Sequence, residues 1–90
     1  MYIYPAKYLS WQTYKDSVYI MDERTEKFRK LDYAAVMLWE ILQEINLYED
    51  ILGKISEIFT TPREMLRKSL DEFLTELSTY EIIEVRDEAR

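Results

Sequence analysis

The sequence predicts an α+β domain in which a three-stranded antiparallel sheet is followed by three helices. From residue 8 to residue 31 apolar side chains alternate at period two, as in strands with one buried face. From Asp32 onward they recur every three or four residues, the spacing of amphipathic helices. The chain has 90 residues with one glycine and two prolines, which favours a single domain over residues 1–90.

The predicted strands occupy about residues 8–31. Two polar interruptions of hairpin length, residues 15–17 and 22–25, divide this region into three runs. The third run is short and basic, with Phe28 between charged neighbours. Alternation places Leu9, Trp11 and Thr13 on one face of the first run. It places Val18, Ile20 and Asp22 on one face of the second run. Tyr19 and Met21 then lie on the opposite face.

The predicted helices span about residues 32–45, 47–59 and 62–80. Asp32, Asn46 and Thr61 are suitable N-cap residues, and Pro62 followed by Glu64 strengthens the third start. Each helix has an apolar stripe. The stripes consist of Tyr33, Val36, Met37, Trp39, Leu42 and Ile45; of Ile51, Leu52, Ile55, Ile58 and Phe59; and of Leu66, Leu70, Phe73, Leu74 and Leu77.

Two further features complete the structural prediction. Residues 82–85 are apolar enough to close the core as a short extended or helical segment, and residues 86–90 are expected to fray. Gly53 lies inside the second helix, where glycine costs about 1 kcal/mol relative to alanine. Close packing against another element is the expected reason for it.

Composition excludes most catalytic chemistry. The chain contains no His and no Cys, which removes imidazole- or thiolate-based nucleophilic sites, the usual zinc ligands and redox dithiols. Pairs such as Glu40 with Glu44 are typical of a solvated helix face, because no calcium-loop motif accompanies them. We therefore expect a binding protein without catalytic residues, metal or cofactor.

Charge and the first residues bear on location and partners. The net charge of −6 argues against generic nucleic-acid binding, which depends on Lys and Arg. No apolar stretch is long enough to span a membrane, and residues 1–9 lack the pattern of a signal peptide. A cytoplasmic location is the expectation.

The basic run Lys27, Arg29 and Lys30 has two interpretations, and composition alone favours neither. Charged side chains on a sheet edge discourage aggregation. They also suit an edge that accepts an incoming peptide strand and attracts acidic residues on it.

The segment VYIMDERTEKFRKLDYAA, residues 18–35, resembles the second and third strands and first helix of PqqD-like proteins. The strand ending in Asp22, the aromatic Phe28 in the next strand, the Leu-Asp pair and Trp39 further on follow that family's pattern. Apolar spacing in the second and third helices also fits. The likeness covers about residues 9–85.

This resemblance implies a winged-helix-like domain that recognises the leader of a ribosomally made precursor peptide. In such proteins the leader adds as an antiparallel strand to the third strand and lies in a groove walled by the third helix. A separate enzyme, such as a radical S-adenosylmethionine maturase or a leader peptidase or cyclase, then acts on the peptide. The residues implied in peptide binding are Lys27, Phe28, Arg29, Lys30, Leu31, Arg63, Arg67, Leu70, Asp71 and Leu74.

Two other functions remain as alternatives. A winged-helix DNA-binding regulator would insert the third helix into the major groove through Arg63, Arg67 and Lys68, although acidic residues interrupt this basic face. A structural oligomerisation domain would use the open sheet edge. The sequence leaves open whether the chain is a monomer or a strand-swapped homodimer.

Overall fold

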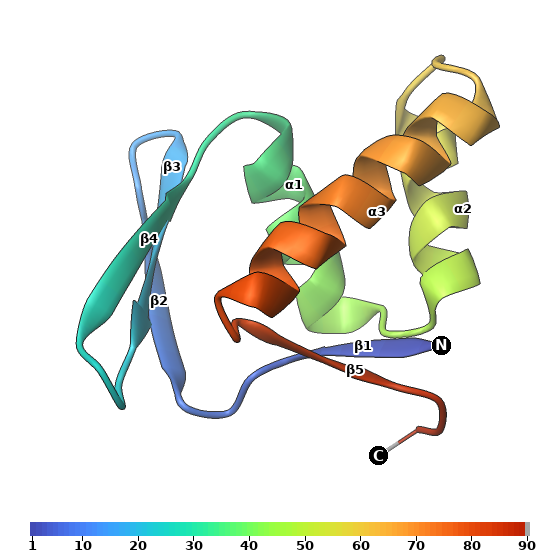
Figure 1. Cartoon of the computed structure of the whole chain (residues 1–90). Coiled ribbons are helices and arrows are strands. Elements are labelled where there is room, and N and C mark those ends of the chain that lie inside the picture. Colours follow the sequence, from blue (N-terminus) through green and yellow to red (C-terminus); the bar gives the residue numbers. More distant parts are fainter. Residues whose placement is uncertain (90) are drawn as a thin grey trace.

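The computed structural model describes residues 1–89, which form two small antiparallel sheets and three helices (Figure 1). In chain order the elements are β1 (Tyr2–Pro5), β2 (Leu9–Tyr14), β3 (Ser17–Asp22), β4 (Lys27–Leu31), α1 (Ala34–Glu44), α2 (Tyr48–Ile58), α3 (Arg63–Thr79) and β5 (Ile83–Arg86). Strands β2, β3 and β4 form one sheet, and β1 pairs with β5 in the other. The predicted α+β class, a three-stranded antiparallel sheet followed by three helices, is confirmed.

The meander β2-β3-β4 has the register that the alternation predicts. Strand β3 pairs with β2 from Val18 opposite Thr13 to Asp22 opposite Leu9, and with β4 from Val18 opposite Leu31 to Asp22 opposite Lys27. Val18 and Ile20 are buried on the face that meets the helices. A one-residue slip would turn both toward solvent, so their burial holds the register.

The sheet β2-β3-β4 stands beside the helices (Figure 1), and large side chains make contact between them. Trp39 of α1 is fully buried, and Trp11 of β2 meets it edge to face with 6.0 Å between ring centroids. Leu31 is half-buried and packs against the same core. These contacts fix the sheet's inner face to α1 and leave its other face exposed.

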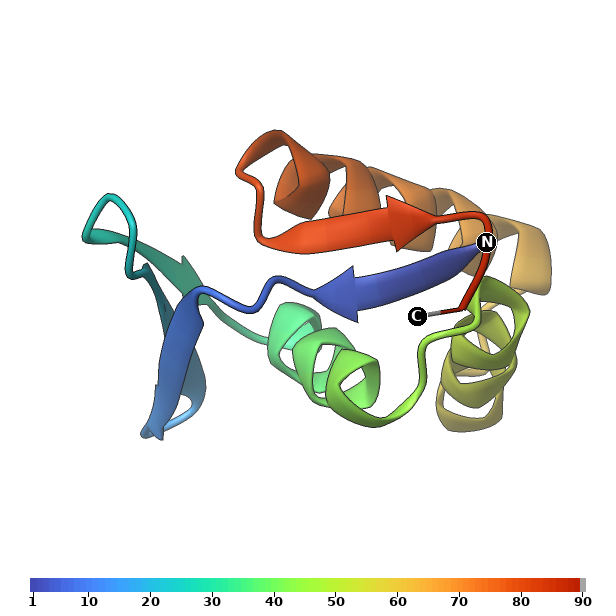
Figure 2. The ribbon, with the colours of Figure 1, turned by 90° about the horizontal axis from the view of Figure 1, so that it is seen from below.

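The pair β1-β5 joins the two ends of the chain beneath the helices, as Figure 2 shows. Tyr2 lies opposite Arg86 and Pro5 opposite Ile83, and Ile3 is completely buried. Sequence analysis assigned no strand to residues 2–5. It also expected fraying from residue 86 on, which is wrong for Arg86 because that residue pairs in β5; residue 90 lies outside the described residues.

The predicted N-caps are wrong for all three helices. Asp32 accepts a hydrogen bond from the Ser17 hydroxyl of the meander, and α1 begins two residues later with Tyr33 at the N-cap. The side chain of Asn46 donates to the carbonyl of Ile3 at 3.0 Å, and α2 begins at Tyr48. Asp32 thus holds a tertiary contact, and Asn46 joins Ile3 to the end of α1, because its side chain also donates to the carbonyl of Leu42 at 3.4 Å. Neither side chain caps the start of a helix.

The third helix starts one residue later than the capping pattern indicates. Pro62 is itself the N-cap residue, α3 begins at Arg63, and no side chain caps it. Gly53 also differs from expectation. A Cβ built there would meet no heavy atom within 4 Å, so close packing does not explain this glycine.

The apolar stripes of the helices are otherwise confirmed. Their buried members, together with strand residues, form one core: Ile3, Val18, Ile20, Trp39, Ile41, Leu42, Tyr48, Ile51, Leu52, Ile55, Leu66, Leu70, Leu74, Leu77, Ile82 and Ile83. Tyr33 and Ile58 are the exceptions, because they are 92% and 44% exposed. Within residues 1–89, no helix has the length and apolar character needed to cross a membrane.

Candidate functional site

Strand β4 is an open sheet edge. It hydrogen-bonds to β3 on one side, and in the described part of the chain no other strand pairs with it. In an antiparallel pair, alternate residues direct their N–H and C=O groups away from the partner strand. The free side of β4 therefore offers backbone donors and acceptors to another extended chain.

Beside this edge lies a groove of about 560 Å³ that separates β4 from the turn after α3. Its floor contains the buried side chains of Ile20 and Ile82 and the half-buried Leu9. The full lining is Leu9, Ile20, Asp22, Arg24, Thr25, Lys27, Phe28, Arg29, Thr79, Tyr80, Glu81 and Ile82. The groove thus combines an apolar floor with a charged and aromatic rim.

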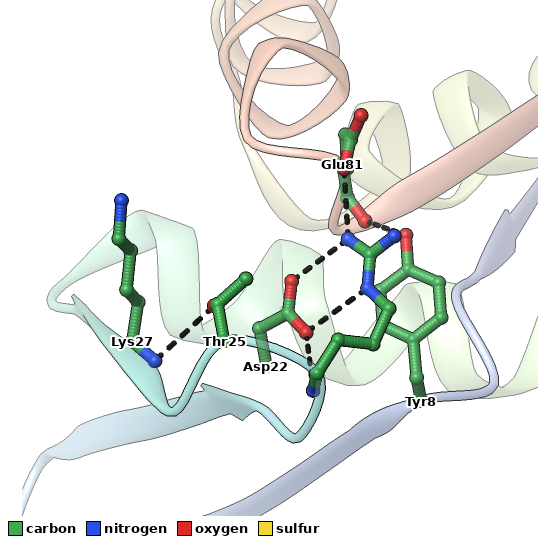
Figure 3. Close-up of polar contacts among 6 residues, drawn as sticks. Tyr8, Asp22, Thr25, Lys27 and Glu81 are labelled. Atoms are coloured by element: carbon green, nitrogen blue, oxygen red, sulfur yellow. Dashed lines mark hydrogen bonds and ion pairs between the residues drawn. The ribbon is translucent and has the colours of Figure 1, made fainter.

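The basic residues of β4 lie in different environments. The Cζ atom of Arg29 lies 3.1 Å from the ring centroid of Tyr80, which immediately follows α3, so the two side chains bridge the groove. Lys30 pairs with Asp32 at 3.8 Å. Lys27 is exposed, and Figure 3 shows its side chain pointing away from the acidic residues nearby. The groove rim is therefore basic on its β4 side although the chain is acidic overall.

Phe28 lies at the boundary between this groove and the outer face of the sheet. It is 65% exposed, and its partner Met21 lies on the face opposite Ile20. A second hollow of about 480 Å³ covers that outer face and is lined by Ser10, Trp11, Gln12, Tyr14, Tyr19, Met21 and Phe28. Phe28 lines both hollows, so a peptide strand beside β4 would cover it.

One end of the groove is closed by a polar cluster around Arg24. Its guanidinium donates to both carboxylate oxygens of Asp22 at 3.1 and 2.9 Å and to Glu81 at 2.8 Å, and it lies 3.6 Å from the ring centroid of Tyr8. The Tyr8 hydroxyl donates to the carbonyl of Glu81 at 2.5 Å. Figure 3 shows Tyr8, Asp22 and Glu81 gathered around this guanidinium. The hydrogen bond from Arg24 lowers the pKa of Asp22.

The residues predicted on α3 do not join β4 at the groove. Leu70 and Leu74 are 1% and 6% exposed, belong to the core and do not line the groove beside β4, so their part in peptide binding stays a prediction. The cause of this placement is the geometry of α3, whose apolar stripe packs on the body of the domain. Only the last residue of the helix, Thr79, lines the groove among the described residues.

Arg63, Arg67 and Asp71 instead face α2. Arg63 and Arg67 contact the two carboxylate oxygens of Glu49 at 3.4 and 3.3 Å. Asp71 accepts a hydrogen bond from the Tyr48 hydroxyl at 2.5 Å. Burial raises the pKa of Tyr48 to about 12, and the bond to Asp71 adds to the shift. These side chains hold the two helices together.

Sequence reasoning missed the residues that close the groove: Tyr8, Asp22, Arg24, Thr79, Tyr80 and Glu81. Arg24 and Glu81 are 57 residues apart, and no motif links them. A local signal existed only for Asp22 and Arg24, because an Asp followed two residues later by Arg in a hairpin turn can form the observed pair. In residues 1–89 no three acidic side chains are grouped so as to hold a metal ion.

Fold and site together define a small α+β domain with an open strand edge beside a groove. The family model for Coenzyme PQQ synthesis protein D (PqqD) matches residues 17–83 of the chain. The chain therefore belongs to the PqqD family, in agreement with the resemblance noted in the sequence.

A solved structure shares this fold. It is that of TbiB1 in complex with the TbiA(beta) leader peptide, which superimposes with a TM-score of 0.85 at 21% sequence identity. The match covers 94% of this chain and 99% of that one. The search of curated proteins returned no match.

Proposed function

We propose that this chain binds the leader segment of a ribosomally synthesised precursor peptide and presents the peptide to a separate modifying enzyme. The open β4 edge beside an apolar-floored groove is the observation that carries the proposal. Membership of the PqqD family and the shared fold with a protein solved in complex with a leader peptide support it.

Backbone pairing and side-chain contacts have different roles in this proposal. A five-residue strand such as β4 offers only a few outward backbone groups, each worth about 0.5–1.5 kcal/mol net. Association and ordering of a free peptide cost at least about 4 kcal/mol. Ladder bonds therefore align the leader, and affinity and specificity depend on apolar contacts with Phe28, Leu31 and the groove floor.

Charge adds a preference for acidic leaders. Lys27, Arg29 and Lys30 lie on the strand that the peptide joins, and acidic side chains on the leader would meet Lys27 and Arg29 at the groove rim. Ion pairs between these basic residues and acidic leader residues would be exposed to solvent, and salt at 0.1 M screens charges over about 10 Å. We therefore expect leader affinity to weaken modestly as ionic strength rises.

The chemistry on the precursor belongs to the partner enzyme. We propose that this chain supplies no catalytic residue or cofactor and that a radical S-adenosylmethionine maturase, or a leader peptidase or cyclase, acts on the captured peptide in the cytoplasm. A strand-swapped homodimer would use the same β4 edge, so leader binding and dimerisation would compete.

Amide NMR titration with a synthetic peptide tests the proposal directly. The peptide is the leader of a short precursor reading frame sought next to the gene for this chain, and a scrambled peptide of the same composition is the control. We expect shifts at residues 27–31 and 79–82 with the leader alone. Equal responses to both peptides, or shifts confined to α1 and α2, contradict leader recognition.

Backbone methylation of the peptide separates strand addition from other modes of binding. N-methylation of alternate residues removes their N–H donors and keeps their side chains. One set of alternate positions should abolish binding and the other should be tolerated, because only one set faces β4. Equal loss from both sets, or none from either, rules out strand addition.

The DNA-binding alternative loses support in the structure. Arg63 and Arg67, which that alternative assigns to the major groove, both contact Glu49. Glu64 and Glu72 lie on the same surface as Arg67 and Lys68. A helix face of mixed charge is poorly suited to a phosphate backbone.

A further inference from the structure

The groove depends on two walls that belong to different sheets. Strand β4 is part of the meander, whereas residues 79–82 lead into β5 of the other sheet. Within residues 1–89 no strand is common to both sheets. The backbone connects the walls through residues 6–8, where the N–H of Ala6 donates to the carbonyl of Ile82 at 2.9 Å and the N–H of Glu23 donates to the carbonyl of Tyr8 at 2.9 Å. The distance between the walls beyond this link depends on side chains.

A side-chain cluster spans this distance at one end. We call Tyr8, Asp22, Arg24 and Glu81 the Arg24 clasp. Asp22 and Arg24 come from the end of β3 and the β3–β4 turn, Glu81 comes from the turn between α3 and β5, and Tyr8 comes from the link between β1 and β2. One guanidinium thus connects both walls of the groove (Figure 3).

The geometry of the clasp is more specific than that of an ordinary surface ion pair. Arg24 binds Asp22 through two nitrogens, shares one of these nitrogens with Glu81, and stacks on Tyr8. The backbone N–H of Arg24 also donates to Asp22 at 2.9 Å, which fixes the turn that carries the guanidinium. Glu81 has a φ of 59°, an uncommon value for a residue with a side chain. The local backbone is arranged to bring these groups together.

We propose that Arg24 is a positioning residue that sets the width of the peptide groove by tying the β3–β4 turn to the turn after α3. This inference rests on the proposed function for its consequence, the capture of a leader strand, but the groove geometry is measurable without a peptide. Loss of the Arg24 contacts leaves Ile20, Val18 and Trp39 in the core, so the fold persists. The stack of Arg29 on Tyr80 and the hydrogen bond from Tyr8 to Glu81 then remain across the groove, and the walls separate where the β3–β4 turn is no longer tied to Glu81.

The first test measures the groove itself. The chain contains no Cys, so Lys27→Cys and Thr79→Cys place a single pair of spin labels on opposite walls. Pulsed dipolar spectroscopy should give a narrow distance distribution that broadens and lengthens when Arg24→Gln is added. An unchanged distribution overturns the proposal whether or not any peptide binds.

The second test measures affinity for the synthetic leader peptide. Arg24→Gln should weaken binding about fivefold or more, a typical size for coupling between linked groups. Lys54→Gln is the matched control, because Lys54 is similarly exposed and pairs with Glu57 at 3.7 Å, but it lies on α2, away from the groove lining. It should leave leader affinity unchanged, because its ion pair lies on a helix that does not line the groove. Thermal unfolding of each variant checks that both remain folded.

Two further variants separate geometry from charge. Arg24→Lys keeps the charge but cannot form the fork and stack, so it should bind the leader as weakly as Arg24→Gln. Glu81→Gln alone should weaken leader binding. In the double variant with Arg24→Gln it should add little, because both substitutions remove the same contact between Arg24 and Glu81. The proposal is overturned if Arg24→Lys binds the leader as tightly as the parent, or if the losses of affinity from Arg24→Gln and Glu81→Gln add in the double variant. If the parent protein binds no leader while the label distances respond to Arg24, the proposed function fails and the clasp stands.

Discussion

Replacement of Phe28 by alanine is the most informative single change at the proposed site. Complete burial of a phenylalanine side chain contributes about 1.5–3 kcal/mol. Phe28 is 65% exposed, so about a third of that, roughly 0.5–1 kcal/mol, already stabilises the fold. The remaining two thirds, about 1–2 kcal/mol, is available to a bound leader strand. We therefore expect Phe28→Ala to weaken leader binding about 5–30-fold and to lower stability only slightly.

Isothermal titration calorimetry with the synthetic leader and urea unfolding measure the two effects separately. Met65→Ala is the matched control, because Met65 is 60% exposed and lies in the first turn of α3, away from the groove lining. It should leave leader affinity unchanged. If Phe28→Ala folds normally and binds like the parent, the peptide does not cover Phe28 and the placement beside β4 is wrong. A stability loss above about 3 kcal/mol would mean that Phe28 belongs to the core.

Other substitutions test the structure away from the groove. Leu70→Ala should lower the free energy of unfolding in urea by about 2–5 kcal/mol, because Leu70 is 1% exposed. A change near zero would contradict its burial in the core. Tyr33→Gly should stabilise the domain by about 1 kcal/mol, since Tyr33 has a φ of 56° and buries almost nothing; a lower melting temperature would contradict that strain. Tyr48 has a pKa raised from 10.0 to about 12, so its contribution is complete below pH 10 and is lost as pH rises through 12. Tyr48→Phe should cost about 1 kcal/mol at pH 7, and its difference from the parent in urea unfolding should shrink between pH 10 and 12; a difference independent of pH contradicts the role of the hydroxyl.

The predictions that held rest on local patterns. Alternation fixed which side chains of β3 face the helices, because a strand has two faces and only one can meet the core: Val18 and Ile20 are buried and Met21 is not. Helical spacing identified Trp39 and Leu42 as core residues for the same reason. The spacing of apolar residues thus predicts which side of a strand or helix is buried.

The residues at which the helices begin depend on tertiary contacts and not on local capping patterns. Asp32 and Asn46 are good cap residues in isolation, yet each bonds to a strand that is distant in sequence, Asp32 to Ser17 and Asn46 to Ile3. A polar side chain takes the partner that the folded chain brings nearest. Local capping preferences of about 1 kcal/mol are small enough to be overridden in this way.

The sequence by itself determined the class of this protein: its α+β order, the faces of its strands and helices, its family, and the basic edge strand that suits a peptide. Only the tertiary structure decided how the ends of the chain meet in β1 and β5, that the end of α3 and the turn after it line the groove, and that Arg24 reaches Glu81 across the groove. The physical reason is range. Periodicity reports on which side of an element is buried, whereas a groove is made by elements far apart in sequence, and its width depends on where the whole fold places them.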